Sequence, residues 1–159
     1  MNARLMKLAL ISLAVGACVY LFLRAAPVWF VPSALHAPLL AHSSIGPMFG
    51  FLPVTTHVIA LSLLTAAALG ATSRSATVAP AIWALINVAF EIGQHASVSP
   101  LLLRILPQRF DDIWLLDQLH PYFTHGTFDP LDIVSALAGA LVAQFLITNM
   151  NSEIRHAPA

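Results

Sequence analysis

The chain has 159 residues, of which 58% are hydrophobic and only 9% are charged, and its mean hydropathy is +0.82. Soluble globular domains carry about 25% charged residues, so the composition excludes an ordinary soluble domain and predicts a membrane protein with several spans. Seven basic and seven acidic residues give a net charge of zero. The basic residues are scattered and form no patch that would bind nucleic acid.

The first apolar stretch covers residues 5–23, with the basic residues Arg4 just before it and Lys7 near its start. At 1.5 Å per residue it is long enough to cross a hydrocarbon core of about 30 Å. A cleaved signal peptide is the alternative, because residues 15–18 loosely resemble a lipoprotein cleavage box that ends in Cys18, the single cysteine of the chain. The apolar run continues beyond Cys18 and stops only at Arg24, which favours a retained anchor.

Residues 25–50 contain four prolines, which rule out a continuous helix. With Trp29 and Phe30 this segment suits an interfacial loop at the level of the lipid headgroups. The second span is predicted at residues 52–71, where hydroxyl side chains recur at helical spacing and can bond to a neighbouring helix. We expect His57 on this span to be buried or pore-facing and paired with an asparagine or threonine.

The link at residues 72–77 is short, so the second and third spans should form an antiparallel hairpin. The third span is predicted at residues 78–95, with Pro80 in its first turn. It carries polar residues at i, i+4, i+7 and i+8, which fall along one stripe of a helix: Asn87, Glu91, Gln94 and His95. An ionisable residue such as Glu91 within a span is expected to face a partner or a wet cavity.

A loop at residues 96–128 separates the third span from the last. Its segment from Phe110 onward has an apolar face beside acidic residues and predicts a short helix lying on the membrane surface. The last span is predicted at residues 131–148, where Ser135, Gly139 and Ala143 form a seam of small residues for packing against another helix. Residues 149–159 are expected to be a frayed polar tail.

Together these segments predict an all-α fold, a single membrane domain of four transmembrane helices with an interfacial helix in the last loop. Four spans place both termini on one side of the membrane. Cytoplasmic termini leave four basic residues inside and three outside, a small preference for that orientation. In this orientation the third span ends on the outer face of the membrane, and the acidic loop lies on the same face.

One constellation in the second half of the chain resembles a known family. Glu91-x-x-Gln94 late in one span, then Thr127-Phe128-Asp129-x-x-Asp132 before the next, and Gly139 within it, are similar to the VanZ-like membrane proteins. The resemblance implies a protein of the bacterial envelope, in the cytoplasmic membrane, in a family of which one member is associated with tolerance of the glycopeptide teicoplanin. The biochemical activity of that family is not established.

The chain departs from the family pattern at two positions. His125 and Gly126 stand where an arginine often precedes the Thr-Phe segment, and Ala136 stands where an asparagine often follows the last aspartate. A site built on that arginine and asparagine would be altered here, although Arg104 or Arg109 could replace the arginine spatially.

The candidate site residues also have structural interpretations. Asp129, Pro130 and Asp132 match a helix start, with an N-cap, a proline at N1 and an acid near the positive end of the dipole. Glu91 could serve a structural partner, and the loop aspartates could simply face water. No histidine spacing typical of a metal site and no nucleophile motif is present, so we predict neither a metal nor a cofactor.

The sequence therefore favours a non-enzymatic envelope protein whose polar cluster near the outer interface recognises a lipid-linked, peptidic or glycopeptide ligand. The predicted ligand-binding residues are Glu91, Gln94, Asp129 and Asp132, with His125 and Arg109 as auxiliaries. One alternative is an intramembrane hydrolase or transferase that uses Glu91 with Asp129 or Asp132. Another is an assembly subunit that contacts membrane partners through the small-residue seam, in addition to the surrounding lipid.

Overall fold

The computed structural model describes residues 2–23, 33–35, 37, 39, 49–107 and 114–156. Every regular element within these ranges is a helix, and none of them is a strand. Four helices are long and apolar enough to cross a membrane. The prediction of an all-α protein with four candidate spans is thus confirmed; the spans are Ala3–Leu23, Leu52–Leu69, Ser73–Gly93 and Pro130–Ser152.

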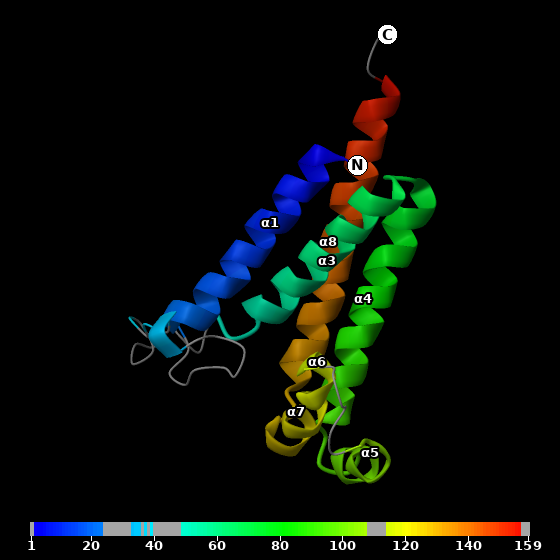
Figure 1. Ribbon diagram of the computed structural model, residues 1–159. Coiled ribbons are helices and arrows are strands. Elements are labelled where there is room, and N and C mark those ends of the chain that lie inside the picture. Colours follow the sequence, from blue (N-terminus) through cyan, green and yellow to red (C-terminus); the bar gives the residue numbers. More distant parts are fainter. Residues whose placement is uncertain are drawn as a thin grey trace.

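The long helices are α1 (Ala3–Cys18), which continues as the π-helical turn η1 (Val19–Leu23), α3 (Leu52–Leu69), α4 (Ser73–Gly93) and α8 (Pro130–His156). Shorter helices are η2 (Ser33–Leu35), α5 (Ser99–Ile105), α6 (Trp114–Asp117) and α7 (Leu119–His125). In Figure 1, α1 begins and α8 finishes at one end of the bundle, and α5, α6 and α7 gather at the other. We call the latter the α7 end. Helix α3 is central, because it contacts α1, α4 and α8.

Two helix boundaries differ from the prediction by five residues or more. Helix α4 begins five residues earlier, at Ser73, because Thr72 and Ser75 form a reciprocal capping box. Pro80 consequently lies inside the helix rather than in its first turn. Helix α8 continues to His156, through most of the segment expected to fray, and no proline or glycine interrupts it there. Residues 157–159 lie outside the described part.

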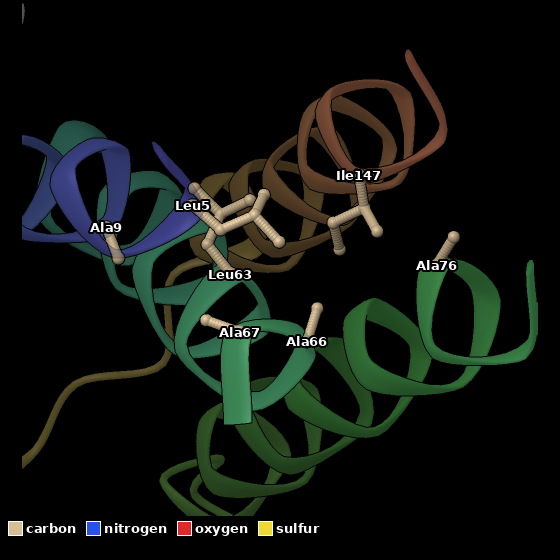
Figure 2. Close-up of a cluster of buried hydrophobic side chains, with 7 residues drawn as sticks. All are labelled: Leu5, Ala9, Leu63, Ala66, Ala67, Ala76 and Ile147. Carbon is tan, nitrogen blue, oxygen red and sulfur yellow. The ribbon is translucent and has the colours of Figure 1, made fainter. Parts of the chain in front are cut away.

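Small and medium apolar side chains make up the core at the end of the bundle opposite α7. They come from all four long helices and meet in the space between them, as Figure 2 shows. Because most of them are alanines, the helix backbones can approach closely. The buried members of this cluster are Leu5, Ala9, Leu63, Ala66, Ala67, Ala76 and Ile147.

The small-residue seam of α8 packs against α3 of the same chain. A Cβ atom on Gly139 would lie 2.7 Å from the Thr55 carbonyl oxygen, so only glycine permits this approach. The Thr55 hydroxyl donates to the Ser135 carbonyl at 3.4 Å, and Ser135 and Ala143 are both buried. The seam therefore joins two helices within the protein.

The structure tests the expectation for His57 and part of the expectation for the last loop. His57 is not buried; it is exposed and lines a cavity between α1 and α3, which leaves the pore-facing alternative open. Its ring hydrogen-bonds to the Pro53 backbone instead of to an asparagine or threonine. The proline-rich loop around Trp29 and Phe30 and the start of the predicted interfacial helix lie outside the described residues, as does Arg109. The described part of that last loop contains three helices, α5, α6 and α7.

Candidate polar site at the α7 end

Glu91 anchors a polar cluster where α4 and α8 meet. It sits two residues before the end of α4, and only 7% of its surface is exposed. Its Oε1 accepts a hydrogen bond from the backbone N–H of Asp129. The carboxylate thus ties the last turn of α4 to the residue that precedes α8, at the edge of the span rather than at its middle.

Asp129 caps α8 as the sequence predicted. Its Oδ1 accepts from the Leu131 N–H at 2.9 Å, and its carbonyl accepts from the Asp132 N–H at 3.0 Å. Pro130 opens the helix, where its missing N–H removes no hydrogen bond. Asp132 lies in the first turn, near the positive end of the helix dipole. Both carboxylates lie close enough to Glu91 for an electrostatic interaction with it.

Gln94 and Tyr122 form the second half of the cluster. Gln94 is the C-cap residue that follows α4, and its side chain hydrogen-bonds to the Tyr122 side chain from α7. The loop after α7 passes so near that a Cβ atom on Gly126 would lie 2.5 Å from the Gln94 Cδ and 2.6 Å from its Oε1. Glycine at position 126 is therefore what lets this loop reach the Gln94 amide.

Burial and the charged groups around Tyr122 shift its pKa. Burial raises the pKa of Tyr122 to about 12, and the negative charge of Glu91 adds to the shift. Interactions with Tyr20 and Asp132 act in the same direction, whereas the hydrogen bond from Gln94 opposes it. Tyr122 thus interacts with four groups, two from α4 and its C-cap and one each from the η1 turn and α8, and it stays a neutral hydroxyl at physiological pH.

Helix α7 is held over this cluster by aromatic contacts. Phe90 of α4 lies 5.5 Å from the Tyr122 ring and 5.7 Å from the Phe123 ring, between ring centroids. The Ser99 hydroxyl of α5 donates to the Phe123 carbonyl at 2.6 Å. A Cβ atom on Gly93 would lie 2.5 Å from the Phe123 ring, so the close packing of α7 against α4 also depends on a glycine.

Four predicted site residues, Glu91, Gln94, Asp129 and Asp132, therefore belong to one network, and the structure adds Tyr122. Sequence reasoning missed Tyr122 because nothing in the loop sequence indicates that α7 folds back onto α4. A tyrosine next to Phe123, in a loop that alternates apolar patches with charged residues, was the only available signal.

The remaining candidates lie apart from that network. The Asn87 amide donates to the Trp83 carbonyl at 2.8 Å. His95 is exposed, with its ring against Phe128 at 5.0 Å. His125 is exposed at the end of α7. Within the described residues, no group of three histidine, cysteine or acidic side chains has an arrangement that could hold a metal ion.

The fold defines a multi-pass helical membrane protein with a polar cluster at one end of its bundle. No protein-family model, curated protein or solved structure matches the chain. The likeness to VanZ-like proteins accordingly depends on the motif residues alone.

Proposed function

We propose that the chain is a non-enzymatic, VanZ-like protein of the bacterial cytoplasmic membrane, with cytoplasmic termini and the α7 end on the outer face. The polar cluster would recognise a polar group of a lipid-linked, peptidic or glycopeptide ligand. The observation that supports this most is the burial of Glu91 among polar groups from α4, α7 and α8, at a depth from which the membrane surface is within reach.

The charges of the cluster favour a ligand with a cationic amine or several N–H donors. Asp129 and Asp132 each repel the Glu91 carboxylate electrostatically, and an ammonium group placed between carboxylates relieves such repulsion. The Gln94 amide and the Tyr122 hydroxyl add neutral hydrogen-bonding groups beside them. His125 and Arg109 would assist as auxiliaries toward an anionic part of the same ligand.

The short helices at the α7 end would form the cover of this site. We place α5, α6 and α7 along the membrane surface, where apolar residues enter the interface and polar residues face water. Leu101 and Ile105 of α5 are exposed, and an interfacial position would bury them in lipid. A ligand confined to the membrane surface would then approach the cluster beneath this layer.

Three isosteric variants test the proposal: Glu91→Gln, Asp129→Asn and Asp132→Asn. We expect Glu91→Gln to accumulate in the membrane as the native chain does and yet to lose the glycopeptide-tolerance or envelope-stress phenotype. Asp117→Asn, an acid on α6, serves as the matched control and should retain the phenotype. If all three variants fail to accumulate, the acids are structural. If they accumulate and keep the phenotype, the cluster does not bind the ligand.

An acid–base enzyme is the second candidate, favoured by the close approach of a buried carboxyl to two further carboxyls and a tyrosine. Turnover of a membrane substrate that disappears in Glu91→Gln, with the fold intact, would support it. An assembly subunit is less favoured, because the seam expected to contact a partner is occupied by α3. Such a subunit would run above the monomer size in mild detergent.

A further inference from the structure

Gln144 places an amide on the outer surface of α8, well inside the last span. Its side chain is exposed, and within the described residues it has no hydrogen-bond partner. The residue lies about 12 Å from the Ser152 end of the span and about 21 Å from the Pro130 end, at 1.5 Å per residue. In a membrane this amide would be surrounded by hydrocarbon, where an unsatisfied polar group is costly.

The geometry of the helix keeps this amide away from the nearer membrane surface. The Cα–Cβ bonds of a helix tilt toward its N-terminus. Helix α8 begins at the α7 end and finishes at the opposite end of the bundle (Figure 1), so from Gln144 this tilt leads toward the middle of the membrane. Lysine and arginine can extend from a span to the headgroups, but glutamine is shorter. The Gln144 amide therefore needs a partner within the membrane.

Gln144 belongs to a row of exposed residues along α8, which we call the outer row. Alternating steps of three and four residues separate its members, and this is the spacing with which one helix packs along another. Helices α3 and α4 pack against the other face of α8, which carries Ala136 and Gly139. The outer row consists of Val134, Leu137, Leu141, Gln144 and Thr148.

A second copy of the chain would supply the matching group. Two copies inserted in the same orientation have parallel α8 helices, and a twofold axis along the membrane normal places each outer-row residue opposite its own counterpart. A glutamine amide has both a donor and an acceptor, so two Gln144 side chains can each donate to the other. Leu137 and Leu141 would pack beside them as in a parallel pair of helices.

We propose that the chain forms a parallel homodimer through the outer row of α8, with reciprocal hydrogen bonds between the two Gln144 amides. A polar residue in such a row fixes the register of the two helices, so Gln144 sets the level at which the copies meet. The dimer contains one kind of chain, which distinguishes it from an assembly subunit bound to other proteins. It does not depend on a ligand at the Glu91 cluster.

Energy transfer between copies in lipid vesicles tests the dimer. The full chain, labelled at its N-terminus with a donor or an acceptor fluorophore, is reconstituted at a series of protein-to-lipid ratios, which gives the dissociation constant. We expect the native chain to dimerise, and Gln144→Leu to raise this constant about fivefold or more, because two hydrogen bonds between amides are lost. Val142→Leu, on another exposed part of α8, should leave it unchanged. Circular dichroism should show the same helix content in both variants.

Disulfide cross-linking tests the geometry and leaves Gln144 in place. Cys18 is the single cysteine, so a Cys18→Ser background allows one cysteine to be introduced on α8. In the membranes of the expressing cells, Leu141→Cys should form linked dimers, because cysteines that face each other across the pair lie within reach of a disulfide. The neighbouring exposed position, Val142→Cys, should form about fivefold fewer.

Three results would each overturn the proposal. The first is a native chain that stays monomeric in vesicles at every protein-to-lipid ratio. The second is an unchanged dissociation constant in Gln144→Leu, and the third is equal cross-linking through Leu141→Cys and Val142→Cys.

Discussion

The side chain of Glu91 accepts a hydrogen bond from the backbone N–H of Asp129, across 38 positions of the chain. The N–H of a residue that caps a helix has no partner within that helix, and a negative charge at this end interacts favourably with the helix dipole. Glu91 therefore has a structural task between α4 and α8 whether or not a ligand binds beside it.

This bond predicts different outcomes for two substitutions of Glu91. Glu91→Gln keeps a side-chain oxygen that accepts from the Asp129 N–H, whereas Glu91→Ala leaves that donor without its partner, which costs about 1–3 kcal/mol. We expect SDS titration of purified protein, followed by circular dichroism, to show this loss for Glu91→Ala and less than half of it for Glu91→Gln. Equal losses would mean that the charge, rather than the hydrogen bond, holds the two helices together.

The Tyr122 environment can be measured directly, because the chain has only two tyrosines. In Tyr20→Phe, tyrosinate absorbance reports on Tyr122 alone. Its midpoint should lie above the usual value of about 10 but below the native value of about 12, because the interaction with Tyr20 that helps to raise the pKa is lost. Adding Glu91→Gln removes a negative charge and should lower the midpoint. Adding Gln94→Leu removes a hydrogen bond and should raise it. If neither change moves the midpoint, Tyr122 does not interact with Glu91 and Gln94 as the structure shows.

The same pKa makes a prediction about alkaline stability. Because the folded state keeps the Tyr122 proton up to about pH 12 while the unfolded chain loses it near 10, stability should fall as pH rises between these values. Below about pH 10 both states hold the proton and no such dependence is expected. Tyr122→Phe should abolish this part of the pH dependence, measured by thermal melts in detergent, and His120→Phe on the same helix should preserve it.

The fold was largely predictable because apolar length decides which segments can span a membrane. The boundaries were less so. At α4 the Thr72–Ser75 capping box sets the start, but a serine at N3 is a weaker sequence signal than the usual glutamate or glutamine. At α8 the apolar run ends before the helix does, because a helix continues where no residue interrupts it.

The site was predictable to the extent that it is local. Glu91 and Gln94 share one helix face, and Asp129 and Asp132 share one helix start, so spacing sufficed to select them. The contact between these two pairs across α4 and α8, and the position of Tyr122 beside them, depend on how α7 packs against Phe90 and Gly93. That packing depends on contacts between segments distant in sequence, which helical spacing cannot indicate.

The contact of Gly139 with α3 provides the last prediction. In Gly139→Ala the new Cβ would lie 2.7 Å from the Thr55 carbonyl oxygen and 3.2 Å from the Val58 Cβ. A backbone atom cannot turn aside as a side chain can, so α3 and α8 must separate, at a cost of about 1–3 kcal/mol for an overpacked core.

Alanine favours a helix interior over glycine by about 1 kcal/mol, so helix propensity alone predicts the opposite sign for Gly139→Ala. A lower SDS midpoint would therefore show that the contact between α3 and α8 outweighs propensity. Ala138→Leu, which adds bulk at the neighbouring exposed position, should leave the midpoint nearly unchanged. If Gly139→Ala instead stabilises the protein, the two helices do not meet at this glycine.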